Sequence, residues 1–145
     1  MADEIQSMRL AMQKDCSARN LKRGRGGTVD VEFAIQMLQL KHARTNPEIL
    51  VPGTLKAIEQ LELAGFLSSE LAERFRTGYR LLRTVEARLR LMNTAARHDF
   101  PENKKQMDKL AFLLQYQSAA QLEIFVNEQR HKIREAFDYI FSDKA

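Results

Sequence analysis

Apolar residues recur every three or four positions along most of this chain, which is the spacing of an α-helix. We find no convincing stretch of alternating polar and apolar residues, as a strand would give, and no internal repeat. No glycine- and serine-rich linker divides the pattern. The sequence therefore predicts an all-α fold, a single bundle-like domain of about six helices over residues 1–145.

The predicted helices differ in length and in how much of their surface is apolar. The first carries Ile5, Met8, Met12 and Cys16 on one face and should end near Asn20. The others should start at Thr28, Thr54, Ser68 or Ser69, Pro101 and Ser118, all favoured at helix N-termini. The fourth is the longest, because Leu71, Phe75, Leu82, Val85, Leu89 and Met92 keep helical spacing over about six turns. We expect this helix to form the centre of the core.

Composition narrows the class of protein. A length of 145 residues suits one domain with a real core, and a net charge of +4 permits an anionic partner without demanding one. Aromatic residues make up 8% of the chain, so a nucleic-acid binder is a weak hypothesis. The single cysteine, Cys16, excludes an internal disulfide and is interpreted as a small buried hydrophobe rather than a nucleophile. Without a signal peptide or membrane span in the sequence, we expect a cytoplasmic protein.

The stretch KRGRGGTVDVEF, residues 22–33, combines positive charge, backbone freedom and two carboxylates. Its glycines, Gly24, Gly26 and Gly27, allow consecutive N–H groups to curl round an anion at the start of the following helix. Its cations, Lys22, Arg23 and Arg25, would bring positive charge to the same ligand. The stretch therefore predicts a phosphate or carboxylate site. The same composition also suits a flexible connection between two helices.

The two carboxylates should face different ways. Asp30 and Glu32 are separated by about 200° round a helix, so they cannot act as a side-by-side pair. Asp30 is expected to turn toward the basic loop, where it would hold an arginine or help to organise a metal-bound phosphate. Glu32 begins a polar row with Gln36 and Gln39 on another surface.

The long helix presents a row of arginines opposite its leucines. They are Arg76, Arg80, Arg83 and Arg90, with Glu86 placed to pair with Arg83 or Arg90. A solvated, self-paired helix face explains this row, and a ligand surface is the alternative. The three histidines, His42, His98 and His131, lack the spacing of a helical zinc site, so no metal is assigned to them. No catalytic residue is assigned.

Several motifs resemble the bacterial glutamine synthetase adenylyltransferases, also called glutamate-ammonia-ligase adenylyltransferases. The glycine stretch followed by IQMLQL is similar to the family's glycine-rich signature. The segment from Asn46 to Leu91 is similar to its helical segment, with Leu82, Arg83, Glu86, Arg88 and Leu89 on the family pattern. HKIREAFDYIF resembles its closing helix, so the similarity runs from about Met8 to Phe141.

The resemblance implies a helical domain that follows a nucleotidyltransferase domain, most simply the C-terminal one. The Gly-Ser and Asp-x-Asp signature of that catalytic domain is missing here, so the chain alone is expected to be an inactive fragment without a cofactor. The parent would use ATP and Mg²⁺ to transfer AMP to a tyrosine of glutamine synthetase. The implied partners are this upstream domain, glutamine synthetase and a PII signalling protein.

The expected nucleotide or effector site collects the residues named above. It comprises Lys22, Arg23, Gly24, Arg25, Gly26, Gly27, Asp30 and Glu32, with Gln36, Arg83 and Glu86 as weaker candidates. Two alternatives remain open. The chain is similar also to the helical domain of the related PII uridylyltransferase, and it would otherwise be an interaction module that docks glutamine synthetase or PII through its arginine face.

Overall fold

The computed structural model describes residues 1–92 and 97–142, and within them every regular element is a helix. The helices are α1 (Ala2–Lys14), α2 (Thr28–His42), the 3₁₀ turn η1 (Pro47–Ile49), α3 (Thr54–Leu63), α4 (Ser69–Leu91), α5 (Lys104–Leu113) and α6 (Ala119–Phe141). The predicted all-α fold of six α-helices is confirmed. None of the described helices combines the length and the apolar character that a membrane span needs.

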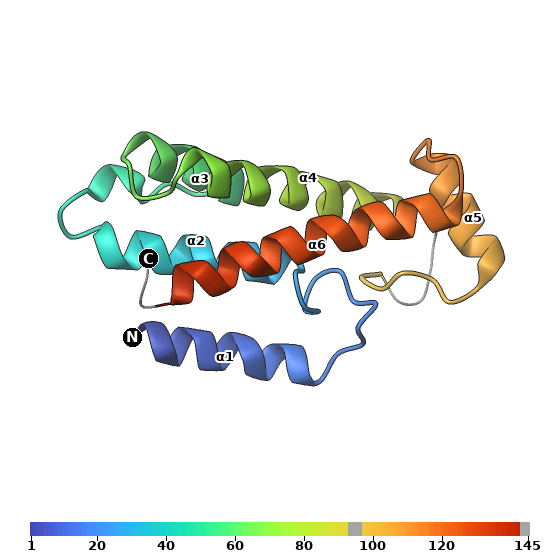
Figure 1. The fold of residues 1–145 in the computed structure, drawn as a ribbon, viewed down its shortest axis with the longest axis horizontal. Coiled ribbons are helices and arrows are strands. Elements are labelled where there is room, and N and C mark those ends of the chain that lie inside the picture. The colour runs from blue at the N-terminus through green and yellow to red at the C-terminus, as the bar shows by residue number, and fades with distance from the viewer. Residues whose placement is uncertain (93–96, 143–145) are drawn as a thin grey trace.

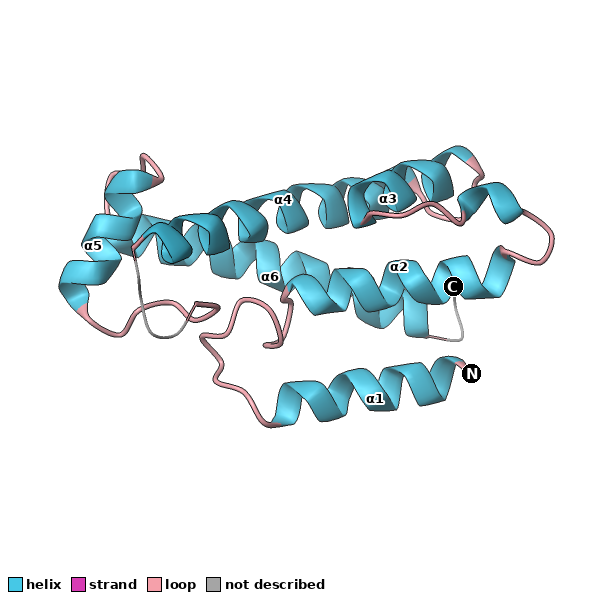
Figure 2. Ribbon diagram, turned by 180° about the vertical axis from the view of Figure 1, so that it is seen from behind, coloured by secondary structure: helices cyan, strands magenta, loops and turns pink. Residues whose placement is uncertain are grey.

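The two longest helices, α4 and α6, run side by side and form the centre of the bundle (Figure 1). Helix α2 packs on both, α3 packs on α2 and α4, and α5 lies across the end where α4 finishes and α6 begins. Helix α1 forms an outer layer against α2 and α6, and the view from behind shows the same arrangement (Figure 2). The loop between α1 and α2 therefore lies beside the middle of α6.

Helix starts follow local capping chemistry. The Ser68 and Ser118 hydroxyls accept hydrogen bonds from the N–H groups three residues on, at 3.2 and 3.1 Å, as a cap requires. Thr28 and Thr54 are the first helical residues rather than caps, because a glycine turn brings the backbone into each helix one residue earlier. The start expected at Pro101 moves to Lys104, because the Asn103 side chain caps α5 by accepting from the Gln106 N–H at 3.2 Å.

The core is continuous across all these elements. Its largest fully buried apolar side chains are Phe75, Phe137, Leu21, Ile35, Ile49, Ile58, Leu61, Leu82, Leu89, Leu110 and Leu122. Helices α4 and α6 approach closely at Gly78, where an added Cβ would lie 2.6 Å from Ile133 Cδ1. A small residue is therefore needed at this crossing.

The buried face of α1 differs from the one expected. Met8 is 62% exposed, whereas the neighbouring Arg9 is fully buried. Arg9 shares the inner face with the half-buried Ile5 and Met12, four residues before it and three after it, whereas Met8 lies at the edge of that face. Cys16 is half-buried, and its thiol donates to the Gln13 carbonyl.

Candidate functional site

The loop between α1 and α2 is tight, and its N–H groups bond within the protein. The Asn20 Oδ1 atom accepts from the backbone N–H groups of Lys22 and Arg23, at 3.0 and 2.7 Å. The N–H groups of Gly24 and Gly27 donate to the carbonyls of Asn20 and Gly24, at 3.1 and 2.9 Å. These donors are occupied, so in this conformation they do not surround an anion as the glycine pattern predicts.

The glycines serve a close approach between the loop and α6. Gly26 has φ of +69°, in the left-handed region, and a Cβ there would collide with the backbone carbonyl of Arg130. A Cβ at Gly24 would collide with the carbonyl of Asn20, and one at Gly27 with that of Lys22. A larger residue at Gly26 would therefore push the loop away from α6, and one at Gly24 or Gly27 would disrupt the tight turn of the loop itself.

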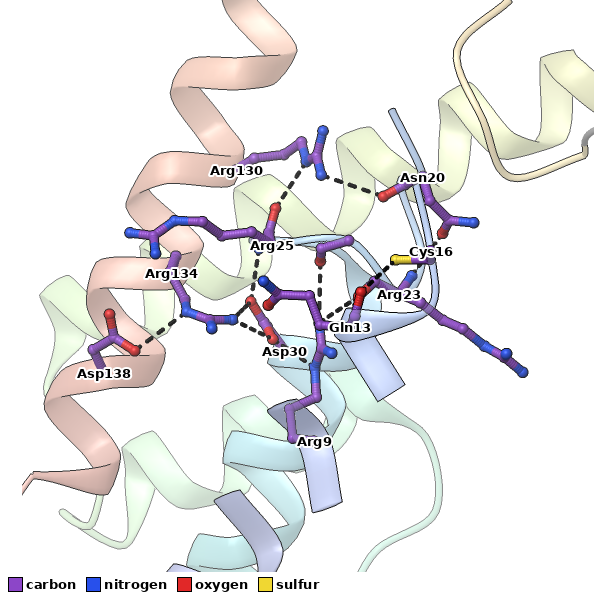
Figure 3. Close-up of polar contacts among 12 residues, drawn as sticks. Arg9, Gln13, Cys16, Asn20, Arg23, Arg25, Asp30, Arg130, Arg134 and Asp138 are labelled. Carbon is purple, nitrogen blue, oxygen red and sulfur yellow. Dashed lines mark hydrogen bonds and ion pairs between the residues drawn. The ribbon is translucent and has the colours of Figure 1, made fainter. Parts of the chain in front are cut away.

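Asp30, in the first turn of α2, holds three parts of the chain together. Its carboxylate accepts from the Gly26 N–H at 2.7 Å and from Arg134 Nη1 at 2.9 and 3.1 Å (Figure 3). Arg9 Nε lies 2.6 Å from Asp30 Oδ1, and neither of these two side chains is exposed. Asp30 thus does hold arginines, as one alternative predicted, but they come from α1 and α6 rather than from the loop.

Arg130 of α6 binds the loop through backbone carbonyls. Its Nε donates to the Arg25 carbonyl at 3.0 Å, Nη1 to the Ala18 carbonyl at 2.9 Å and Nη2 to the Asn20 carbonyl at 3.2 Å. From α1, Arg9 Nη2 donates to the carbonyls of Arg23 and Gly24. Two buried guanidinium groups therefore fix the loop from opposite sides.

The buried guanidinium groups share few negative charges. Burial lowers the pKa of Arg9, against the opposing effect of Asp30 and with a further lowering by Arg134. Burial likewise lowers the pKa of Arg130, and the negative charge of Asp30 has a smaller effect in the opposite direction. Beyond Asp30, the described residues supply only Asp138, at the edge of the cluster, 3.2 Å from Arg134 Nε. Positive charge is therefore in excess among these buried groups.

The exposed cations of the loop do not converge on one point. The side chains of Arg23 and Arg25 leave the loop in opposite directions (Figure 3). Arg25 lines a pocket beside α6, whereas Arg23 and Lys22 line a different hollow with His98 and Asp99. All three cations were expected to serve one ligand. In the structure Arg25 points to one side of the tight turn, whereas Lys22 and Arg23 point to the other.

A second polar group joins α2 to α4. The Tyr79 hydroxyl donates to Glu32 at 3.4 Å, and Glu86 Oε2 lies 3.1 Å from His98 Nδ1 and 4.0 Å from Arg83. Burial raises the pKa of the half-buried Glu32 carboxyl, although nearby Lys22 and Tyr79 lower it. Glu86 is 2% exposed, and among the described residues its Oε1 atom has no hydrogen-bond partner.

The predicted site residues thus do not form one cluster. Asp30 and the three glycines are buried in the support of the loop, whereas Lys22, Glu32, Arg83 and Glu86 lie at the α2–α4 group. Arg23 and Arg25 are exposed on different sides of the loop. Gln36 is exposed farther along α2. Whether any of them contacts a nucleotide or effector stays a prediction.

The arginine row on α4 is paired in part, as its first interpretation predicts. Arg76 contacts Glu62 and Glu73, both at 2.7 Å, and Arg83 lies 4.0 Å from Glu86. Arg80 and Arg90 are exposed. Half of the row is therefore neutralised within the chain.

No three His, Cys, Asp or Glu side chains gather closely enough to hold a metal ion within the described residues. His42 stacks on the Phe66 ring at 3.9 Å, and His131 lies 3.3 Å from Glu135. His98 pairs with Glu86 in the α2–α4 group. The histidines thus have separate partners in separate parts of the fold.

Sequence reasoning missed the three arginines that support the loop, Arg9, Arg130 and Arg134. A signal was available, because Arg130 lies four residues after Val126 and Arg134 three residues before Phe137, on the apolar face of α6. Arginines placed on a buried helix face need partners inside the fold.

This helical bundle and its glycine loop match a known domain family. The family model described as GlnD PII-uridylyltransferase matches residues 1–141. The chain belongs to this family. The match covers all six α-helices.

Curated relatives carry the name "bifunctional glutamine synthetase adenylyltransferase/adenylyl-removing enzyme". The protein from Mycobacterium bovis is 38% identical over 103 residues, 68% of this chain and 10% of the relative. The protein from Mycobacterium leprae is 38% identical over 104 residues, which are 69% of this chain and 10% of the relative. The protein from Cutibacterium acnes is 35% identical over 112 residues, which are 74% of this chain and 11% of the relative. The resemblance to glutamine synthetase adenylyltransferases is confirmed. The chain spans about a tenth of the length of these relatives.

Proposed function

We propose that this chain is the helical domain of a bifunctional glutamine synthetase adenylyltransferase/adenylyl-removing enzyme. The observation that carries the proposal is the 35–38% identity to relatives of that name, within a family match that spans residues 1–141. A nucleotidyltransferase domain of the same polypeptide would transfer AMP from ATP to a tyrosine of glutamine synthetase. The helical domain would complete the nucleotide or effector site from outside.

The side chains proposed for this contact are Lys22, Arg23 and Glu32, with Arg83 and Glu86 behind them. Lys22 and Arg23 line one hollow, which Asp15 and Asp99 also line, and the positive charge of the two cations suits phosphate oxygens. Glu86 Oε1 is buried without a partner among the described residues, so a donor from a ligand or a neighbouring domain would remove the cost of that unpaired oxygen.

ATP and Mg²⁺ belong to the proposed parent enzyme. The metal would neutralise phosphate charge and stabilise the departing pyrophosphate. The described residues of this chain form no metal-binding group, so the metal ligands would come from the nucleotidyltransferase domain. This chain would orient the nucleotide through Lys22 and Arg23.

The buried part of the loop would act by position. Asp30 and the glycines hold the backbone that carries Lys22 and Arg23, and none of their side chains reaches the surface. Their proposed role in the site is to fix the direction of the exposed cations, because a loose loop would lose the orientation that catalysis needs.

The test uses the full-length enzyme that carries this domain. Lys22→Gln, Arg23→Gln and Glu32→Gln should each lower kcat/KM for ATP in adenylylation about tenfold, the effect of losing one charge-assisted contact of roughly 1.4 kcal/mol. The matched control is Arg44→Gln, an exposed arginine just beyond the far end of α2. Unchanged kinetics in all three variants would contradict the proposal.

The arginine face of α4 gives the alternative of docking, with glutamine synthetase or a PII signalling protein as partner. Arg80→Glu tests it better than a change at Arg76, which is tied to Glu62 and Glu73. Lost binding of either partner with unchanged affinity for ATP would favour docking over a nucleotide contact. If Arg80→Glu still binds glutamine synthetase and the PII protein as well as the unsubstituted enzyme does, the arginine face is not the docking surface.

A further inference from the structure

The hollow between α1, the glycine loop and α6 has the chemistry of an anion site. Its volume is about 480 Å³. The side chains that matter in its lining are those of Gln13, Ser17, Arg25, Asn127, Arg130 and His131. This described lining holds two arginines and a histidine but no aspartate or glutamate. We propose that this pocket binds a phosphate-type oxyanion between Arg25 and Arg130.

The charge of Arg130 is the first argument. The side chain is 8% exposed, and its three described hydrogen bonds all go to neutral backbone carbonyls. No ion pair among the described residues includes Arg130. A buried cation without a nearby anion is costly, and a bound oxyanion would remove that cost.

The donors still available are the second argument. A guanidinium group carries five N–H donors, of which Arg130 uses three in the described structure, so two remain for a ligand. Gln13 also lines the pocket, and its side-chain amide carries two neutral N–H donors.

The remaining lining fits an oxyanion with several oxygens. Arg25 is exposed and extends toward α6 (Figure 3), while Ser17 and Asn127 add neutral donors. His131 also lines the pocket, but its Nε2 atom lies 3.3 Å from Glu135, so it is a secondary contact. Donors arriving from the loop and from α6 suit a tetrahedral phosphate better than a planar carboxylate.

This inference goes beyond the proposed function, because it concerns a different side of the loop and needs no second domain. Arg23 and Lys22 lie in the hollow with His98, on the other side. An anion between Arg25 and Arg130 would tie α1, the loop and α6 together. Phosphate would thereby stabilise the conformation in which the loop presents its other cations.

The test uses the 145-residue chain and inorganic phosphate. Backbone and arginine side-chain NMR signals are followed during a phosphate titration at constant ionic strength, kept with sodium chloride. We expect saturable shifts at Arg25 and Arg130, and a thermal midpoint that rises with phosphate concentration. Arg25→Gln should weaken phosphate binding about tenfold. The fold should survive this change, since only the backbone carbonyl of Arg25 bonds to Arg130.

The matched control is Arg44→Gln, which removes the same charge from an exposed arginine just beyond the far end of α2. It should leave phosphate affinity within about twofold of the unsubstituted chain, because exposed charges separated by more than a Debye length are screened. Equal losses in the two variants, or shifts that never saturate, would overturn the proposed site. Acetate binding as tightly as phosphate would overturn its assignment to phosphate-type anions.

Discussion

Replacing Asp30 by asparagine removes the only carboxylate that the described structure places between two buried arginines. Arg9 is fully buried and Arg134 is 4% exposed. The substitution keeps the size of the side chain and an oxygen that can still accept from the Gly26 N–H at this position. What it removes is the negative charge that lies 2.6 Å from Arg9 Nε and 2.9 Å from Arg134 Nη1.

The expected loss is large. Breaking a buried ion pair from one side costs about 3–5 kcal/mol, because the remaining charge is left without compensation. In Asp30→Asn, Arg134 keeps Asp138, whose side chain is 53% exposed, whereas Arg9 keeps only backbone carbonyls in the described structure. We therefore expect the free energy of unfolding to fall by about 3–5 kcal/mol, a large share of the roughly 5–15 kcal/mol typical of a domain.

The assay is urea unfolding of the 145-residue chain followed by far-UV circular dichroism. The matched control is Glu32→Gln, which removes the same charge two residues further along α2 from a half-buried site. It should change the free energy of unfolding by less than about 1 kcal/mol. A loss below about 1 kcal/mol in Asp30→Asn, with an unchanged urea slope, would refute the reasoning.

A double-mutant cycle separates the ion pair from other effects of the substitution. Arg9→Met alone removes one of the two buried cations that depend on Asp30. If the charges act together, Arg9→Met should cost less in the Asp30→Asn background than in the unsubstituted chain, by about 1–3 kcal/mol. Simple addition of the two losses would show that Arg9 and Asp30 contribute independently.

Three further predictions concern single positions. Gly26→Ala should lower the free energy of unfolding by more than about 2 kcal/mol, and Gly65→Ala by about 1 kcal/mol. Both glycines have positive φ, but only Gly26 faces a backbone carbonyl of α6. Urea unfolding of the two variants measures the difference. Gly78→Ala should lower the free energy of unfolding by about 1–3 kcal/mol. Adding Ile133→Val should restore part of this stability, because it removes the Cδ1 atom that the new Cβ meets. A double variant no more stable than Gly78→Ala alone would contradict that clash. Burial raises the pKa of Glu32 in the folded state above its ordinary value of 4.5. The contribution of Glu32 to the free energy of unfolding should therefore fall as pH rises from about 4.5 to that higher pKa. Glu32→Gln should abolish this fall when unfolding is measured over the same pH range.

Much of the fold followed from local sequence signals. The helical period of apolar residues predicted six helices, and two serine caps placed the starts of α4 and α6. The errors lie where a single position was assigned by residue type alone. Met8 was expected inside and Arg9 was overlooked, although both positions lie within about one turn of Ile5 on the same side of the helix. A long basic side chain on that face stays buried only if acceptors from elsewhere meet it.

The sequence by itself determined the helices, their order and the family, because helical spacing, caps and motif similarity are properties of neighbouring residues. Only the tertiary structure decided the use of the glycine loop. Its N–H groups bond to Asn20 and Asp30, and its carbonyls bond to Arg9 and Arg130, which lie on α1 and α6. Residues more than a hundred positions apart meet there. A glycine-rich loop has the freedom to bind an anion or to pack against a helix, and the packed partners select between these outcomes.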